Sequence, residues 1–111
     1  MANAAESGGS IVAVHQSVED FLGSVRLEPD DRPSTVIVDP PRTGLSKDAL
    51  DGVLRLRASR LVYVSCDVAT LARDARRIVD AGERYAIARA DAFDLFPNTP
   101  HVETVVVFDR L

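Results

Sequence analysis

The single cysteine of the chain stands in the segment YVSCDVATLARD, residues 63–74, after an apolar run and before a helical pattern. A thiol between a strand end and a helix N-terminus faces free N–H groups and the positive end of the helix dipole, and both favour the thiolate. The thiolate is the reactive form, so Cys66 is a candidate nucleophile for covalent catalysis. A free cysteine is more commonly a small buried hydrophobic side chain, which is the alternative interpretation.

Several familiar kinds of cysteine chemistry lack their partners in this sequence. A phosphatase loop needs an arginine six residues after the cysteine, but Ala72 stands there and Arg73 comes one residue later. There is no C-x-x-C pair for thiol exchange, and one cysteine with two separated histidines predicts no metal site. Spacing leaves a protease-like pairing with His101 open, although no protease signature surrounds Cys66.

Two other polar groupings follow expected strands. They are Asp39-Pro40-Pro41-Arg42 and the segment 91–103, which contains Glu103. Ligands of open α/β sheets bind beyond the carboxyl ends of the strands, so these positions are candidates for a site. Each also has a plain structural interpretation: Asp39 as a cap in a loop, and Glu103 as an exposed strand residue.

The elements that must position these residues alternate along the chain. The sequence predicts strands at 11–15, 35–39, 61–65 and 85–90, and a last one in HVETVVVFDRL. The runs at 35–39 and 61–65 are apolar on both faces, which is typical of buried parallel strands. Helices are expected between the strands up to residue 82. The order indicates the α/β class, with a mostly parallel sheet, covering helices and a final antiparallel strand pair.

Capping residues mark the ends of the expected helices. Ser17, Ser46 and Asp67 each precede a helical pattern and can accept a hydrogen bond from its first free N–H groups. Gly82 follows the last of these helices and suits a C-terminal stop.

Composition limits the partners of the chain. Its 111 residues suffice for one small domain, and the net charge of −4 is unlike that of a free-standing nucleic-acid binder. No apolar run has membrane-spanning length, so we expect no membrane partner. A lone cysteine forms no intrachain disulfide, and a cytoplasmic location is the simplest expectation.

Three motifs together resemble a known family. DPPRTGL (39–45), YVSCDVATLARD (63–74) and DAFDLFPNTPHVETVVVF (91–108) are similar, in order and spacing, to the C-terminal part of the RNA 5-methyluridine methyltransferases. These enzymes use S-adenosylmethionine to methylate C5 of uridine in ribosomal or transfer RNA. The resemblance is strong over residues 35–111 and loose over residues 3–34, and it leans toward the 23S ribosomal RNA branch. It implies the C-terminal half of a Rossmann-like class I methyltransferase sheet.

The resemblance also implies roles for individual residues. Cys66 matches the nucleophile, Glu103 the general base, and Asp39 a carboxylate at the cofactor pocket. The positions implied for substrate binding are Pro40, Pro41, Arg42, Thr70, Phe96, Thr99 and His101. The family usually carries a proline where this chain has Val68, and a first-turn proline would stiffen that loop.

Parts of the family pattern are missing from this sequence. Residues 1–10 read as a flexible tail or a helix stub, and 11–111 as a partial catalytic domain. The glycine-rich first strand of the cofactor site and the RNA-binding domain are not present. We therefore expect an incomplete S-adenosylmethionine site, an inactive isolated chain, and contact with RNA, ribosomal rather than transfer, through parts outside this sequence.

The missing first strand has a structural consequence. Without it, the run at 35–39 has an open, apolar edge, which favours pairing with another strand. We expect the chain to self-associate, or the run at 11–15 to occupy the vacant place.

Two other functions remain open at this point. One is a non-catalytic α/β module for assembly or binding, in which Cys66 is an inert thiol. The other is an amino-methyltransferase-like domain, since such enzymes also carry a D/N-P-P motif. They need an aromatic residue after the prolines, however, and this chain has Arg42.

Overall fold

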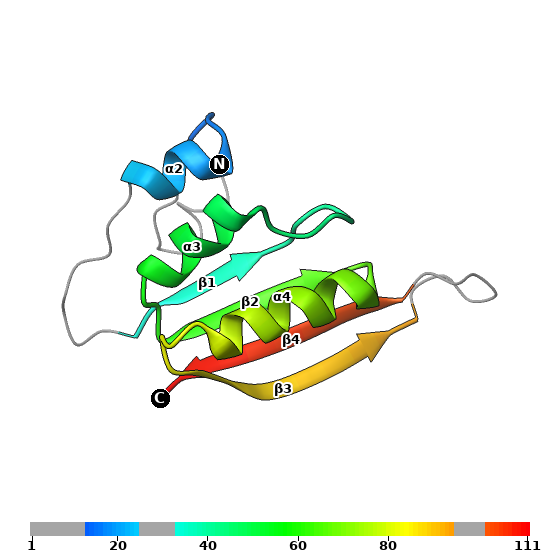
Figure 1. Cartoon of the computed structure of the whole chain (residues 1–111). Coiled ribbons are helices and arrows are strands. Elements are labelled where there is room, and N and C mark those ends of the chain that lie inside the picture. Colours follow the sequence, from blue (N-terminus) through cyan, green and yellow to red (C-terminus); the bar gives the residue numbers. More distant parts are fainter. Residues whose placement is uncertain (1–12, 25–32, 95–101) are drawn as a thin grey trace, which may run out of the picture.

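A computed structural model describes residues 13–24, 33–94 and 102–111 (Figure 1). Its elements, in chain order, are α2 (Val18–Ser24), β1 (Thr35–Val38), α3 (Lys47–Arg55), β2 (Arg60–Ser65), α4 (Val68–Asp80), β3 (Tyr85–Phe93) and β4 (Glu103–Arg110). The alternation predicted from the sequence is confirmed from β1 onward. Strand β3 extends three residues beyond the predicted end at Ala90.

Within the described residues, the strands form one sheet in the order β1-β2-β4-β3. β1 pairs parallel with β2, while β4 pairs antiparallel with both β2 and β3. Consequently β1, β2 and β3 point the same way and β4 alone runs against them (Figure 1). The final antiparallel pair that the sequence predicts is confirmed. Three of the four described strands share one direction, but only one of the three pairings is parallel, so the sheet is mixed.

The helices begin and end where the capping residues predict. Ser17 accepts a hydrogen bond from the Asp20 N–H at 3.1 Å, and Ser46 accepts one from the Ala49 N–H at 3.1 Å. Asp67 caps α4 in the same way through the Thr70 N–H. After α4, Gly82 adopts a φ of 84°, the left-handed conformation that a helix stop uses and that glycine enters without steric cost.

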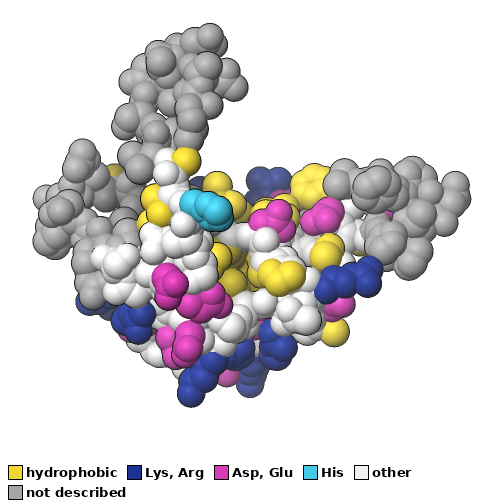
Figure 2. Space-filling view, turned by 90° about the horizontal axis from the view of Figure 1, so that it is seen from above, with side chains coloured by type: hydrophobic (Ala, Val, Ile, Leu, Met, Phe, Trp, Pro, Cys, Tyr) yellow, Lys and Arg dark blue, Asp and Glu magenta, His cyan; other side chains and the backbone are white. Residues whose placement is uncertain are grey.

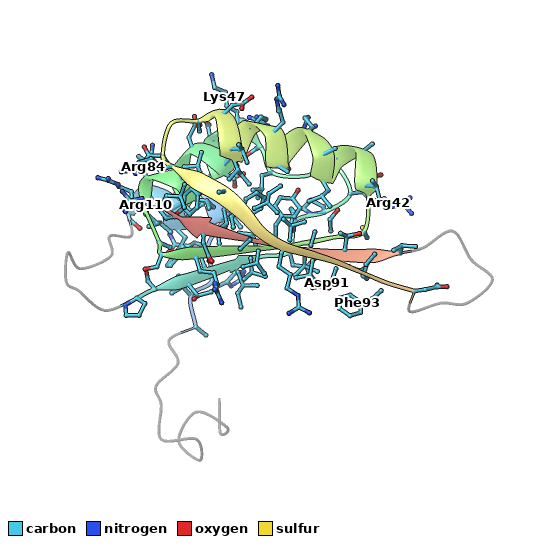
Figure 3. The ribbon with its side chains drawn as sticks, turned by 90° about the horizontal axis from the view of Figure 1, so that it is seen from below. Arg42, Lys47, Arg84, Asp91, Phe93 and Arg110 are labelled. Atoms are coloured by element: carbon cyan, nitrogen blue, oxygen red, sulfur yellow. The ribbon has the colours of Figure 1, made fainter. Side chains whose placement is uncertain are left out.

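Helices α3 and α4 lie on the same face of the sheet (Figure 3). The connections β1–α3–β2 and β2–α4–β3 advance in one direction across the sheet, so right-handed crossovers place both helices on one side. The core forms between them and that face. Its fully buried side chains include Leu61, Tyr63, Ile78 and Phe108.

The opposite face of the sheet corrects one expectation. The run at 35–39 is not buried on both sides, because within the described residues no helix covers the second face. Ile37 is 68% exposed, and Val62 and Val64 of the central strand β2 are only partly buried. The β-branched residues of this run therefore reflect the preference of such residues for strands, and they do not indicate burial on both faces of the sheet.

The strand predicted at 11–15 is wrong for Ala13, Val14 and His15, which form no strand. Ile11 and Val12 lie outside the described residues. β1 pairs only with β2 in the described sheet, so these three residues gain no ladder hydrogen bonds, and they do not fill the place beside β1. No helix in the described parts of the chain is long and apolar enough to cross a membrane.

Candidate active site at one edge of the sheet

The three polar groupings found in the sequence meet at one edge of the sheet. Asp39 follows the end of β1, Cys66 follows the end of β2, and Glu103 begins β4. Because β1 and β2 are parallel and β4 runs against them, the carboxyl ends of β1 and β2 and the beginning of β4 lie at the same end of the sheet (Figure 1). This is the edge at which open α/β sheets bind ligands.

The pairing of β2 with β4 determines where Cys66 and Glu103 lie relative to each other. Ser65 is paired with Thr104, the last pair of this ladder. The next residue on each strand is Cys66 on one side and Glu103 on the other. Both residues therefore lie directly beyond the last pair of the β2–β4 ladder, at the same end of the sheet.

Ser65 holds the loop around Cys66 in a fixed conformation. Its buried hydroxyl accepts a hydrogen bond from the Asp67 N–H at 3.0 Å and donates one to the Asp67 carbonyl oxygen at 2.8 Å. Cys66 stands between these two residues and is exposed. The interpretation of Cys66 as a buried structural thiol is therefore wrong.

The first turn of α4 fixes the other side of this loop. The Asp67 carboxylate accepts a hydrogen bond from the Thr70 N–H at 3.0 Å, and the Asp67 carbonyl oxygen accepts one from the Leu71 N–H. The Thr70 N–H bond lowers the pKa of Asp67, and the charge of Arg42 adds to this effect. Asp67 is thus an ionised cap, and it supplies rigidity that a proline at Val68 would otherwise give.

The loop after β1 folds into a tight turn. The Gly44 N–H donates to the Pro41 carbonyl oxygen at 2.8 Å, and Gly44 has a φ of 81°. Asp39, Pro41 and Arg42 are exposed, and Arg42 lies at the site edge of the molecule, opposite the end that carries Arg84 and Arg110 (Figure 3). The turn therefore presents polar groups to whatever occupies this edge.

Thr70 has a contact that the sequence did not predict. Its hydroxyl donates to the Arg42 carbonyl oxygen at 2.8 Å, so it is engaged with the loop after β1. Phe93 is also a new member of the site edge: it is paired with Glu103 and is 47% exposed. Opposed residues in an antiparallel ladder share one face, so this ring lies beside Glu103.

A cleft of about 1230 Å³ opens beside β1. Figure 2 shows hydrophobic side chains at the bottom of a hollow on the face seen from above. The cleft walls are mostly apolar and come from α2, β1 and the loop after β1, with Asp39 among the lining residues; they include Val18, Phe21, Val36, Val38, Pro40 and Pro41. The lining also includes Glu19 and the cationic side chains of Lys47, Arg73 and Arg77. Mostly apolar walls with charges of both signs suit a ligand that has an aromatic part and charged groups.

A buried carboxylate beneath the loop was missed by the sequence analysis. Asp74 of α4 is fully buried, and its Oδ2 accepts hydrogen bonds from the Tyr63 hydroxyl at 2.6 Å and the Leu45 N–H at 2.9 Å. Burial alone would raise the pKa of Asp74, but these hydrogen bonds and Arg73 lower it below the ordinary value. A signal was available, because Asp74 occupies the inner stripe of α4 between Leu71 and Ile78.

Part of the predicted site lies beyond what the structure describes. Phe96, Thr99 and His101, which the resemblance implies as substrate-binding residues, fall in the segment 95–101. Among residues 13–24, 33–94 and 102–111, no group of three or more His, Cys, Asp or Glu side chains is gathered as for a metal ion.

Comparison with known proteins gives one consistent result. Residues 16–111 match the family model described as tRNA (uracil-5-)-methyltransferase. An uncharacterized RNA methyltransferase of Nitratidesulfovibrio vulgaris is 49% identical over 78 residues, covering 70% of this chain and 16% of the relative. The 23S rRNA (uracil(1939)-C(5))-methyltransferase RlmD of Pseudomonas putida is 50% identical over 76 residues, covering 68% of this chain and 16% of the relative.

A solved structure shares the fold. The crystal structure of Pyrococcus abyssi tRNA (uracil-54, C5)-methyltransferase, in complex with S-adenosyl-L-homocysteine, superposes with a TM-score of 0.70 at 34% sequence identity. The match covers 96% of this chain and 24% of that one. This chain spans between 16% and 21% of the length of the curated relatives that it matches.

Proposed function

The chain belongs to the tRNA (uracil-5-)-methyltransferase family, and from this premise we propose that it carries the reacting edge of an RNA uridine-C5 methyltransferase. The observation that carries the proposal is the β2–β4 register, whose last pair, Ser65 and Thr104, is followed at the same end of the sheet by Cys66 on one side and Glu103 on the other. Methylation of C5 requires two groups, a nucleophile that adds to C6 and a base that removes the proton from C5.

Cys66 is proposed as the nucleophile. C5 of uracil is a poor nucleophile until a thiolate adds to C6, which moves the electron pair of the C5–C6 double bond onto C5 and the O4 carbonyl. The exposure of Cys66 and the two Ser65–Asp67 hydrogen bonds support this role, because they hold the sulfur accessible in one conformation. A base in an RNA stack must turn out of the stack to reach it.

Glu103 is proposed as the base. After C5 has gained the methyl group it still carries its proton. A carboxylate beside C5 takes that proton, the C5–C6 double bond re-forms, and the bond between Cys66 Sγ and C6 breaks, which returns the thiolate. The position of Glu103 at the first residue of β4, partly buried and paired with Phe93, supports this assignment.

S-adenosylmethionine is the proposed cofactor, and when bound it supplies a methyl group on a positively charged sulfur. The residues present fit one side of such a molecule. Asp39 would hold its positive charge, and the apolar cleft wall at Val36, Val38 and Pro40 would receive its aromatic ring. The bound S-adenosyl-L-homocysteine of the Pyrococcus abyssi enzyme supports the choice of cofactor.

Ribosomal RNA is the proposed substrate class. The relative from Pseudomonas putida that is named for 23S rRNA is 50% identical over 76 residues, whereas the enzyme from Pyrococcus abyssi that is named for tRNA is 34% identical over a longer match that covers 96% of this chain. The net charge of −4 supports recognition of the RNA mainly through parts outside this sequence. Because the S-adenosylmethionine site is incomplete, we propose that the isolated chain does not methylate RNA by itself, although it retains the residues proposed to add to C6 of a uridine.

The proposed chemistry has a test that needs no cofactor. Reversible addition of Cys66 to C6, with deuteration and deprotonation at C5, exchanges the C5 hydrogen of uridine for deuterium from D₂O. We expect this exchange in a uridine oligonucleotide, followed by proton NMR, and its loss in Cys66→Ser. Glu103→Gln should slow it by roughly 10²-fold or more, because proton transfer by a positioned group typically contributes that much.

The control is the same measurement with Arg76→Gln, a variant on the solvent-exposed face of α4. It should exchange like the wild-type chain. Exchange that continues at the wild-type rate in Cys66→Ser would contradict the proposed role of the thiol.

A further inference from the structure

Side chains of α4 form hydrogen bonds with backbone atoms of three residues of the loop after β1. Thr70 donates to the Arg42 carbonyl oxygen at 2.8 Å, and Arg73 donates to the Thr43 carbonyl oxygen at 2.8 Å. Asp74 accepts from the Leu45 N–H at 2.9 Å. Because these bonds involve backbone atoms of the loop, they fix the loop conformation independently of the contacts of the loop side chains.

The Asp74 side chain is held rigidly because both of its carboxylate oxygens accept hydrogen bonds. Oδ2 accepts from Tyr63 as well as from Leu45, while Oδ1 accepts from Arg73 at 3.2 and 3.1 Å and from Arg77 at 3.4 Å. A fully buried carboxylate without such partners is strongly unfavourable, so it holds the single arrangement that satisfies it. Through the Tyr63 hydroxyl, this arrangement is anchored in the central strand β2.

Gly44 shows how closely the loop backbone lies on α4. A Cβ at this position would stand 2.3 Å from the Thr70 methyl carbon and 2.6 Å from Asp74 Oδ2, and the φ of 81° is strained for any L side chain. Gly44 therefore allows the backbone contact that the three hydrogen bonds maintain.

Thr70 connects this loop to the loop that holds Cys66. Its N–H bonds the Asp67 carboxylate at 3.0 Å, and its hydroxyl bonds the Arg42 carbonyl oxygen. One residue thus fixes both the segment that follows Cys66 and the segment that follows Asp39.

We propose that Thr70, Arg73 and Asp74 are positioning residues, which clamp the loop of residues 39–45 onto α4 and set its place relative to Cys66. The clamp acts through loop backbone, so Thr70 supports the site rather than touching the substrate. This inference rests on the proposed function for its meaning in catalysis, while the clamp itself is a property of the chain alone.

The test compares Thr70→Val with Thr70→Ser. Valine keeps the methyl group that lies against Gly44 and loses the hydroxyl, whereas serine keeps the hydroxyl and loses the methyl group. Both retain the N–H that bonds Asp67. Because one hydrogen bond is removed, we expect amide hydrogen exchange at Gly44 and Leu45 to become roughly tenfold faster in Thr70→Val, with Thr70→Ser close to the wild-type chain.

The same variants are then measured for deuterium exchange at uridine C5. A positioning role predicts a roughly tenfold lower maximal exchange rate in Thr70→Val, an unchanged half-saturating uridine concentration, and recovery in Thr70→Ser. Unchanged loop amide exchange in Thr70→Val would overturn the clamp, and a loosened loop with an unchanged C5 exchange rate would overturn its positioning role. If the wild-type chain exchanges no C5 hydrogen, the proposed function fails, while the amide measurement still decides the clamp.

Discussion

At the scale of single residues, Asp74 connects more parts of the structure than the exposed groups of the site do. It is fully buried, it joins α4 to β2 through Tyr63, and it holds the loop after β1 through the Leu45 N–H. Its charge is compensated by Arg73 and Arg77, which lie at the surface end of the same cluster. Replacing the carboxylate by an amide turns one of its two acceptor oxygens into a donor, so the N–H or O–H groups bonded to that oxygen lose their acceptor.

This arrangement gives a prediction for Asp74→Asn. We expect a loss of about 3 kcal/mol in the free energy of unfolding at pH 7, since one partner of a buried ionic cluster is removed. The pKa of Asp74 is lowered by folding, so its stabilisation is present above the pKa of an unfolded aspartate, about 4, and is lost as the pH falls through the lower folded value. The stability of Asp74→Asn should therefore fall less steeply below pH 4.

Urea unfolding between pH 7 and pH 3 measures both effects. Asp80→Asn is the matched control, because Asp80 lies on the same helix in an exposed pair with Arg76 and should change stability by no more than about 0.5 kcal/mol. Equal slopes below pH 4 for the wild-type chain and Asp74→Asn would contradict the assignment.

The residues that carry chemistry were predictable to different degrees. Cys66 and its place before a helix follow from local sequence, and so does the Asp67 cap. The role of Thr70 did not follow, because its partner is the Arg42 carbonyl oxygen, 28 positions away. A backbone acceptor has no sequence signature, so only the folded arrangement reveals it.

At the scale of elements, helix boundaries were the most predictable feature. Ser46, Asp67 and Gly82 act on N–H and C=O groups within a few residues, so their effects are local and visible in the sequence. The strand pairing at the site is different. The antiparallel β3–β4 pair was expected from the missing helix, but the insertion of β4 between β2 and β3 depends on contacts across the whole sheet.

The strand wrongly predicted over residues 13–15 and the burial wrongly predicted on both faces of β1 have a common cause. An apolar run indicates a strand only if a neighbouring strand and a covering layer exist. Ala13, Val14 and His15 have no strand beside them in the described sheet, and β1 has a covering helix on one face only. Both errors therefore concern what lies next to an element, which its own residues do not determine.

At the scale of the whole molecule, β1 and β3 are the two edge strands of the described sheet, and β1, with the sequence TVIV, carries no charged residue. β1 pairs on one side only, Ile37 is 68% exposed, and the apolar cleft lies beside it. Exposed sheet edges without charge or proline promote pairing between chains. The self-association expected from the sequence stays a prediction, and the unpaired side of β1 is the surface at which we expect it.

Ile37→Lys tests this surface. A charge on the edge strand should shift the wild-type association, measured by analytical ultracentrifugation over a range of concentrations, toward monomer. The change should alter folding stability by no more than about 0.5 kcal/mol, because the side chain is exposed. Val79→Lys, on the exposed side of α4, should associate like the wild-type chain. A wild-type chain that stays monomeric at every concentration would contradict the prediction.

The central claim is that Cys66 adds to C6 of a pyrimidine ring at this sheet edge. The most direct measurement is the fluorine NMR spectrum of a 5-fluorouridine oligonucleotide mixed with the chain, because addition at C6 turns C5 from a trigonal into a tetrahedral carbon and moves its fluorine resonance. The account predicts a second resonance with the wild-type chain that is absent with Cys66→Ser. A single, unshifted resonance in the presence of the folded wild-type chain would contradict it.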